Sequence, residues 1–249
     1  MPFLWRPDRP NRDKAAGCAI PRHMHFLWQF LGDGADLPPR ELDNYRRWHE
    51  LNPDWKSTIQ TPNSIDEIIP GQSTRSLYEK LKTPIQRCDL ARPILLQQHG
   101  GIYTDLDVEP FRDMDWLYSL FPHANVLLIE EVTLTKASSI RRGKRFSIRQ
   151  GNPELRLRVG NFWMASVAGH PFWDDVIALI EQRKQLPIQY DYDVIYTTGP
   201  DIISEVYHQV VEKYDDVVLV PRKTARRFFR HRTHGSWRMN DNRITTRAA

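Results

Sequence analysis

Two aspartates, Asp105 and Asp107, stand two positions apart after the glycine pair Gly100-Gly101 and a short expected strand. In an extended chain, residues i and i+2 point to the same side, so both carboxylates would face one site. Adjacent carboxylates repel each other unless a cation lies between them. Mg²⁺ and Mn²⁺ prefer oxygen ligands and often share them with phosphate groups. The pair therefore predicts a metal site that holds a diphosphate.

A second polar pair, Asp89 and Arg92, stands one helical turn apart before the glycines. Thr83 and Pro84 suit the N-cap and first turn of a helix that would carry this pair. Pro93 lies inside that helix and lacks an N–H, so we expect a kink there. The helix would bring Asp89 and Arg92 against the ligand whose diphosphate the metal holds.

The bulk composition is that of a globular protein, with 249 residues of which 40% are hydrophobic and 27% charged. This length favours one α/β domain over two small ones. The chain has neither an apolar run of the ~20 residues that a membrane helix needs nor a signal peptide, so we expect a cytoplasmic protein. Cys18 and Cys88 fit a reducing compartment, with one disulfide left open by the count alone.

The net charge is +4, and the basic residues gather in two clusters. The clusters are either solvated loops or contacts for an anionic partner such as a diphosphate or the inner membrane surface. Nucleic acid is the least favoured partner because no known binding motif accompanies the charge. The two clusters are Lys136, Arg141, Arg142, Lys144, Arg145, Arg149, Arg156 and Arg158, and Arg222, Lys223, Arg226, Arg227, Arg230, Arg232 and Arg238.

The segments that must position these residues alternate between strands and helices, which predicts an α/β sheet with a ligand site at the strand ends. We expect a loose segment over 1–19 and one domain over 20–249 that ends in a basic element from about 221. The expected strands are 23–30, 55–60, 125–130, 161–166 and 217–220. The expected helices are 38–51, 64–69, 73–82, one from 84, 171–184 and 201–212.

The segment DLARPILLQQHGGIYTDLD, at 89–107, resembles the sugar-binding region of glycosyltransferases with a DxD motif. These are the OCH1-like mannosyltransferases and capsular-polysaccharide glycosyltransferases of family 32, with the glucosylating domain of large clostridial toxins as a more distant relative. Further segments agree in order over about residues 20 to 238. They are HFLW at 25–28, NPDW at 52–55, NFWMA at 161–165 followed by HP at 170–171, TGP at 198–200 and HGSW at 234–237.

This resemblance implies a GT-A-type fold, a Rossmann-like mixed sheet flanked by helices that binds a nucleotide-sugar and Mn²⁺ or Mg²⁺. It implies that Asp107 binds the metal and that Asp105 contacts the metal and the ribose. Asp89 and Arg92 would hold hydroxyls of the donor sugar. His234 has suitable chemistry for a third metal ligand. The other implied donor-binding residues are Trp28, Tyr103, Asn161, Ser236 and Trp237.

Simpler interpretations stand beside some of these roles. Trp28 is suited to stack on a nucleobase but could instead be a core tryptophan of a buried strand. The segment 234–237 could be part of a basic tail. For His25 and His170 we favour structural roles, and for Cys88 packing on the helix.

The leading hypothesis is a metal-dependent retaining glycosyltransferase of polysaccharide biosynthesis or a related pathway. It would move a hexose from a UDP- or GDP-sugar to a hydroxyl of a glycan, a lipid-linked acceptor or a protein. Because the sequence shows no nucleophile motif, we favour front-side attack. Two alternatives remain open: a nucleotidyltransferase that uses the Asp pair for a metal–triphosphate, and a non-catalytic basic protein that binds nucleic acid or anionic lipid.

Overall fold

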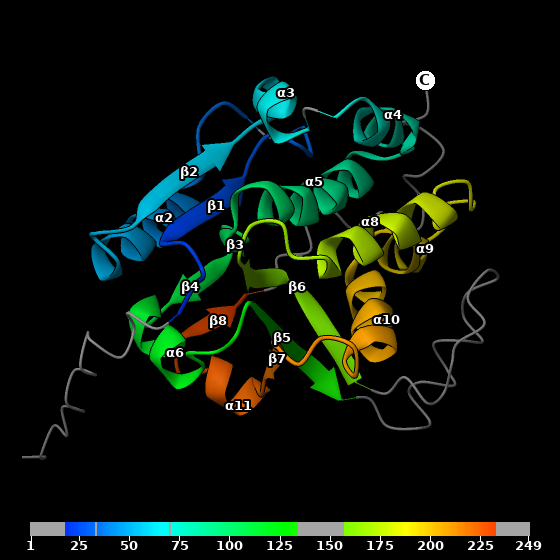
Figure 1. Cartoon of the computed structure of the whole chain (residues 1–249). Helices are drawn as coiled ribbons and strands as arrows, with labels where there is room; N and C mark the ends of the chain where they lie inside the picture. The colour runs from blue at the N-terminus through cyan, green and yellow to red at the C-terminus, as the bar shows by residue number, and fades with distance from the viewer. Residues whose placement is uncertain (1–17, 33, 70, 134–156, 233–249) are drawn as a thin grey trace, which may run out of the picture.

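A computed structural model describes residues 18–32, 34–69, 71–133 and 157–232 (Figure 1). A six-stranded sheet with the order β2-β1-β3-β6-β5-β7 forms its centre. Both pairings of β6 are antiparallel, whereas the other neighbouring strands are parallel. The strands are β1 (His23–Leu27), β2 (Lys56–Gln60), β3 (Gly101–Thr104), β5 (Val126–Thr133), β6 (Leu157–Ser166) and β7 (Val217–Val220).

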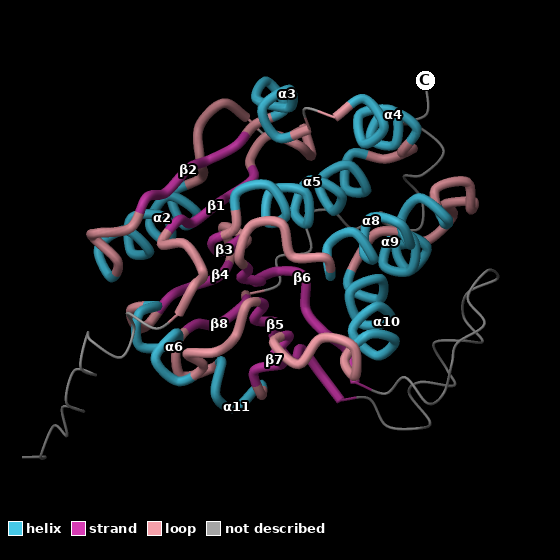
Figure 2. Tube along the Cα trace, viewed as in Figure 1, coloured by secondary structure: helices cyan, strands magenta, loops and turns pink. Residues whose placement is uncertain are grey.

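Helices cover both faces of this sheet, and the strands lie between them (Figure 2). Side chains of β5 alternate between the two faces, which explains its continuous apolar run. One face carries α3 (Ile65–Ile68), α4 (Gln72–Lys80), α5 (Pro84–His99), α8 (Phe172–Arg183), α9 (Asp191–Thr197) and α10 (Pro200–Val210). The other face carries α2 (Pro39–Leu51), α6 (Met114–Leu120) and α11 (Arg222–Ala225).

A second, two-stranded sheet pairs β4 (Val108–Pro110) with β8 (Phe229–His231) in antiparallel register. It packs on the face of the main sheet that carries α2 and α6. This small sheet joins a segment directly after the acidic pair to a segment more than a hundred residues further along the chain.

Helix α5 is the central helix of its face and is buried nearly all round. Thr83 and Gln86 form a reciprocal capping box at its start, with Pro84 as the first helical residue. The helix continues through Pro93 to His99 as one element, and the expected kink stays a prediction. Because α5 packs against both α8 and the sheet, polar side chains on it are removed from water.

The expected mixed α/β architecture is confirmed, whereas several element limits are wrong. The first strand ends at Leu27 and not at residue 30, because Gln29 has a φ of 66° that no strand residue adopts. Strand β6 begins at Leu157, four positions before its expected start at 161. The elements β4, β8, α6, α9 and α11 were not expected; each has only three to seven residues.

The expected division into a loose segment over 1–19 and a single domain over 20–249 stays a prediction, because residues 1–17 and 233–249 lie outside the described structure. Within the described part, no helix has the length and apolar character needed to cross a bilayer.

The turn from α5 into β3 depends on a glycine that no other residue can replace without strain. Gly101 has a φ of 89°, and a Cβ atom there would stand 2.3 Å from the carbonyl oxygen of His23. We expect Gly101→Ala to lower the free energy of unfolding by about 3 kcal/mol or more, as measured by urea denaturation. Gly32→Ala is the matched control, since Gly32 has a φ of 79° but no atom within 4 Å of the added Cβ.

The control should lose only about 1 kcal/mol, the cost of the left-handed backbone conformation. Equal losses in the two variants would show that the close approach of Gly101 to β1 does not matter.

Candidate active site

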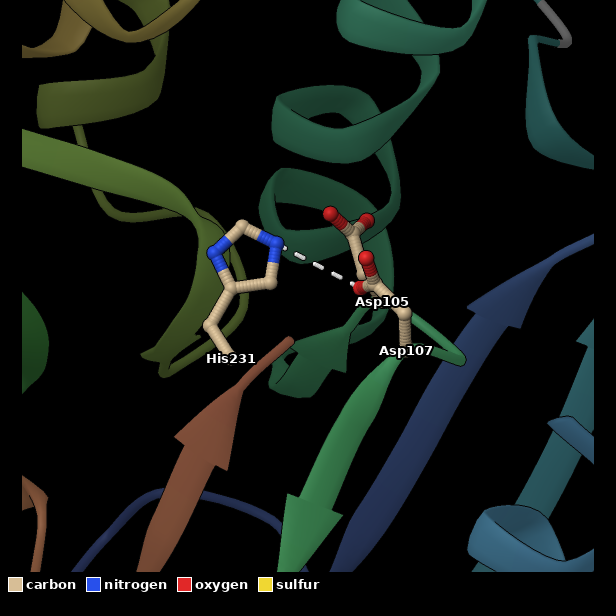
Figure 3. A group of neighbouring side chains, drawn as sticks. All are labelled: Asp105, Asp107 and His231. Carbon is tan, nitrogen blue, oxygen red and sulfur yellow. Dashed lines mark ion pairs between the residues drawn. The ribbon is translucent and has the colours of Figure 1, made fainter. Parts of the chain in front are cut away.

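Asp105 and Asp107 lie in a tight turn between β3 and β4. The N–H of Val108 donates to the carbonyl oxygen of Asp105 at 3.1 Å, and the N–H of Asp105 donates to Phe162 O on β6 at 2.9 Å. The prediction that an extended chain aligns the two aspartates is therefore wrong, because a turn brings them together instead. Their carboxylates still converge at the carboxyl end of β3, the edge where ligands of α/β sheets bind (Figure 3).

His231 on β8 completes this acidic pair from a distant part of the chain. It stands opposite Val108 in the small sheet, and its Nε2 lies 3.4 Å from Asp107 Oδ1. Its ring stacks on Phe162 at 4.2 Å between centroids. Burial alone would lower the pKa of His231, but the carboxylates around it, Asp107 foremost and then Asp105 and Glu131, together raise the pKa above its usual value.

The three side chains suit a divalent cation. One ligand atom from each of Asp105, Asp107 and His231 lies within 4.8 Å of the others. Two carboxylates and an imidazole form a mixed oxygen and nitrogen set that accepts Mn²⁺ or a similar ion. Burial raises the pKa of Asp105, against the opposing effect of Arg92, and a cation would compensate the desolvated negative charge. These residues would therefore hold the metal that a DxD motif implies.

Asp89 on α5 is buried, with 5% of its surface exposed, and three side chains donate to it. Arg92 Nη1 and Asn161 Nδ2 reach its Oδ1 at 2.8 and 3.1 Å. Thr198 Oγ1 reaches its Oδ2 at 3.0 Å. Burial raises the pKa of Asp89 to about 6, although the Arg92 charge and the Thr198 hydroxyl act in the opposite direction. The three hydrogen bonds thus fix the orientation of the Asp89 carboxylate, which burial removes from water.

Arg92 connects Asp89 to the acidic pair. Its Nη2 lies 3.1 Å from Asp105 Oδ1, and its Nε donates to the Tyr103 hydroxyl at 2.9 Å. That hydroxyl in turn donates to Asp105 Oδ1. Burial raises the pKa of Tyr103 well above its usual value, so the phenol keeps its proton for this bond. The expected sugar-binding pair and the expected metal-binding pair therefore form one hydrogen-bonded group.

The structure brings together Asp89, Arg92, Tyr103, Asp105, Asp107 and Asn161, all of which the sequence proposed as site residues. Trp28 follows β1 at the same sheet edge, is half-buried and donates from Nε1 to Gly34 O at 3.0 Å. Its stacking on a nucleobase stays a prediction. His234, Ser236 and Trp237 lie outside the described residues, so their roles also stay predictions.

Sequence reasoning missed two residues of the site, His231 and Thr198. His231 gives no local signal because the strand that carries it has three residues. Thr198 was noticed only as part of the TGP segment, and its contact with Asp89 spans 109 positions.

The structural roles expected for two other residues agree with the geometry. His25 is fully buried and contacts Gly100 O through Nε2 at 3.0 Å. Cys88 packs within α5, and burial raises its pKa to about 12, so it stays a thiol.

Comparison with known proteins agrees with this geometry. Residues 38–131 match the family model described as "Glycosyltransferase sugar-binding region containing DXD motif". "Inositol phosphoceramide mannosyltransferase 3" of Schizosaccharomyces pombe is 25% identical over 238 residues, which cover 90% of this chain and 57% of the relative. "Initiation-specific alpha-1,6-mannosyltransferase" of Candida albicans is 23% identical, with 75% of this chain and 52% of the relative covered. The chain thus spans about half the length of these relatives.

Solved structures support the fold. The PaToxG glycosyltransferase superposes with a TM-score of 0.54 at 15% identity, covering 81% of this chain and 74% of that chain. The ligand-free glycosyltransferase domain of the YGT toxin gives a TM-score of 0.52 at 11% identity, with 81% and 80% covered. The GT-A-type fold and the resemblance to DxD-containing glycosyltransferases are both confirmed.

The raised pKa of Asp89 predicts a pH-dependent stability. The folded protein holds this proton more tightly than the unfolded chain does, so the Asp89 contribution is lost as pH rises from about 4 to about 6. Asp89→Asn cannot titrate there. Without metal, its stability relative to the wild type should therefore rise by about 3 kcal/mol between pH 4 and pH 7 in urea denaturation.

Asp215→Asn is the control, because Asp215 is exposed in the turn before β7. It should follow the wild-type pH dependence. A difference between Asp89→Asn and wild type that does not change with pH would contradict the raised pKa.

Proposed function

We propose that this chain, whose residues 38–131 match the DXD-containing glycosyltransferase sugar-binding region, is a metal-dependent retaining hexosyltransferase that uses a nucleotide-diphosphate sugar. One observation carries the proposal: Arg92 joins the buried Asp89 carboxylate to the acidic pair through Asp105. A site for a metal alone would not need a third, buried carboxylate beside the acidic pair. A sugar attached to a metal-bound diphosphate does need an acceptor for its hydroxyls at this position.

The residues divide the chemistry between them. Asp105, Asp107 and His231 would hold the metal, which when bound supplies Lewis-acid stabilisation of the leaving diphosphate. Asp89 would accept hydrogen bonds from hydroxyls of the donor sugar, a type of contact that distinguishes sugars better than apolar packing does. Arg92 keeps Asp89 and Asp105 oriented and partly neutralised.

The surroundings of Asp89 support front-side attack. A carboxylate that already accepts three hydrogen bonds is a weak nucleophile, so a covalent ester at Asp89 is disfavoured. In our proposal the acceptor hydroxyl approaches on the face from which the diphosphate departs. The bond between the acceptor oxygen and the anomeric carbon forms as the bond between that carbon and the phosphate oxygen breaks. The proton of the acceptor hydroxyl passes to the leaving phosphate oxygen. The product keeps the anomeric configuration of the donor.

Mannose is the first donor sugar to test, and a hydroxyl of a phosphoinositol lipid or of a glycan is the first acceptor. The printed names of the relatives, an inositol phosphoceramide mannosyltransferase and an initiation-specific mannosyltransferase, support this choice. The family match and these names favour sugar transfer over the nucleotidyltransferase alternative.

A peripheral contact with an anionic membrane surface is part of the proposal. Basic side chains on and directly after α11 are exposed, namely Arg222, Lys223, Arg226 and Arg227. The following strand, β8, carries His231, so this basic surface is linked by a short stretch of chain to the candidate metal site. A lipid-borne acceptor would then reach the site from the membrane. The first basic cluster lies outside the described residues except for Arg158, whose Nε lies 2.8 Å from Glu131 Oε2.

Release of nucleoside diphosphate from UDP-glucose, UDP-galactose, UDP-N-acetylglucosamine and GDP-mannose, each with and without Mn²⁺, tests the reaction. We expect one donor to be hydrolysed only with metal. Asp107→Ala should lower the rate about 100-fold or more, because the metal contribution is worth several kcal/mol. Asp66→Ala, which changes an exposed carboxylate on α3, should leave the rate unchanged.

Proton NMR should show that the first-formed product has the same anomeric configuration as the donor. Thermal stabilisation of the wild type by GDP or UDP should need Mn²⁺ and should vanish in Asp107→Ala. If neither nucleotide stabilises the wild type with Mn²⁺, the proposal fails.

Co-sedimentation with vesicles tests the membrane contact. Binding to vesicles containing phosphatidylserine should weaken roughly tenfold or more in Arg226→Ala/Arg227→Ala, since each basic residue near the surface contributes about 1 kcal/mol. It should also weaken as salt is raised. The matched control is Arg46→Ala/Arg47→Ala, which removes two exposed arginines from α2. Equal weakening of vesicle binding in both double variants would show that binding depends on total charge and not on the surface around α11.

A further inference from the structure

We propose that Thr198 is a positioning residue that aims the second oxygen of Asp89 at the donor sugar. The inference rests on the proposed function and names a further residue of the same site. Thr198 belongs to neither the acidic pair nor α5, and it reaches Asp89 from the corner between α9 and α10.

The hydrogen bonds divide unequally between the two oxygens of Asp89. Arg92 and Asn161 both donate to Oδ1. Thr198 donates to Oδ2. Each carboxylate oxygen offers two lone pairs. Oδ1 therefore has both of its lone pairs engaged by these two residues, and Oδ2 can accept one more hydrogen bond. The bond from Thr198 occupies one lone pair of Oδ2 and, together with the two bonds to Oδ1, fixes the plane of the carboxylate and so the direction of the remaining lone pair.

The chain around Thr198 is built to keep its hydroxyl in place. Thr198 is the C-cap of α9, and its N–H and that of Gly199 both donate to Val194 O at 3.0 Å. A Cβ at position 199 would stand 2.8 Å from Ile195 Cα, so only glycine lets α10 begin this close to α9. Pro200 then opens α10 with a fixed φ. The corner is a compact unit, with 2% of Thr198 exposed.

Thr198 also has a second acceptor within reach, because its Oγ1 lies 3.3 Å from Val194 O. A hydroxyl has one proton and donates it to one acceptor at a time. Val194 O already accepts the N–H groups of Thr198 and Gly199, so the hydroxyl proton stays on Oδ2 of Asp89, and a sugar hydroxyl can bind the second lone pair of that oxygen. Valine has nearly the same shape but no proton to donate, so Thr198→Val isolates this single hydrogen bond.

Isothermal titration with GDP-mannose and with GDP, each in the presence of Mn²⁺, tests the proposal. If the wild type binds another donor better, that donor and its nucleoside diphosphate are used instead. We expect Thr198→Val to weaken the nucleotide-sugar about 10- to 100-fold, the loss expected for a hydrogen bond to a charged group. The nucleoside diphosphate has no sugar, so its affinity should stay within about twofold of the wild type. Thr198→Ser keeps the hydroxyl and should restore nucleotide-sugar binding to within about threefold.

Thr197→Val is the matched control, because Thr197 is the buried neighbour whose hydroxyl donates to Asp193 O at 2.7 Å. Thr197→Val removes a hydroxyl one position away from Thr198. It should not change the affinity for the nucleotide-sugar relative to the affinity for the nucleoside diphosphate. Melting temperatures of all variants show whether each is folded.

Two results would overturn the proposal. One is an equal loss of affinity for nucleotide-sugar and nucleoside diphosphate in Thr198→Val, which is the behaviour of a purely structural residue. The other is a failure of Thr198→Ser to restore the affinity for the nucleotide-sugar. Because titration needs no turnover, a wild type that binds but does not transfer sugar would contradict the proposed reaction and not the role of Thr198.

Discussion

The buried charge of Arg92 is the constraint on which the rest of the site depends. A guanidinium on a helix that is covered on nearly all sides is stable only if carboxylates and hydrogen-bond acceptors surround it. Asp89 supplies one carboxylate from the same helix, and Asp105 supplies the other from the end of β3. Because Arg92 contacts both carboxylates, it sets how close the expected sugar site lies to the expected metal site.

The topology of the sheet supplies the remaining partners. Strands β1 and β3 are parallel, so their carboxyl ends lie at one edge of the sheet, where Trp28 and the acidic turn also lie. The antiparallel strand β6 enters this edge from the opposite direction, so Asn161 in its first half meets Asp89. Strand β8 returns along β4 and places His231 beside Asp107. One reversed strand and one short return strand thus convert a sheet edge into a site.

Much of this could be predicted from the chain itself because the signals are local. The N-cap at Thr83, the i,i+3 spacing of Asp89 and Arg92, and the glycine pair before the aspartates each lie within a few residues. Strands such as β7 appear as continuous apolar runs because both faces of the sheet are covered. The limits of β1 and the short strands β4 and β8 were not predictable in this way, since a left-handed residue or a three-residue pairing leaves no periodicity.

The sequence by itself determined the chemical groups: an acidic pair after glycines, a carboxylate and a guanidinium one turn apart, and an α/β pattern to carry them. Only the tertiary structure decided how these groups meet. It joined Asp105 to Arg92 and brought His231 and Thr198 to their partners across more than a hundred positions. The reason is physical: helix caps and i,i+3 pairs are fixed by local geometry, whereas the partner of a buried charge is fixed by which elements pack around it.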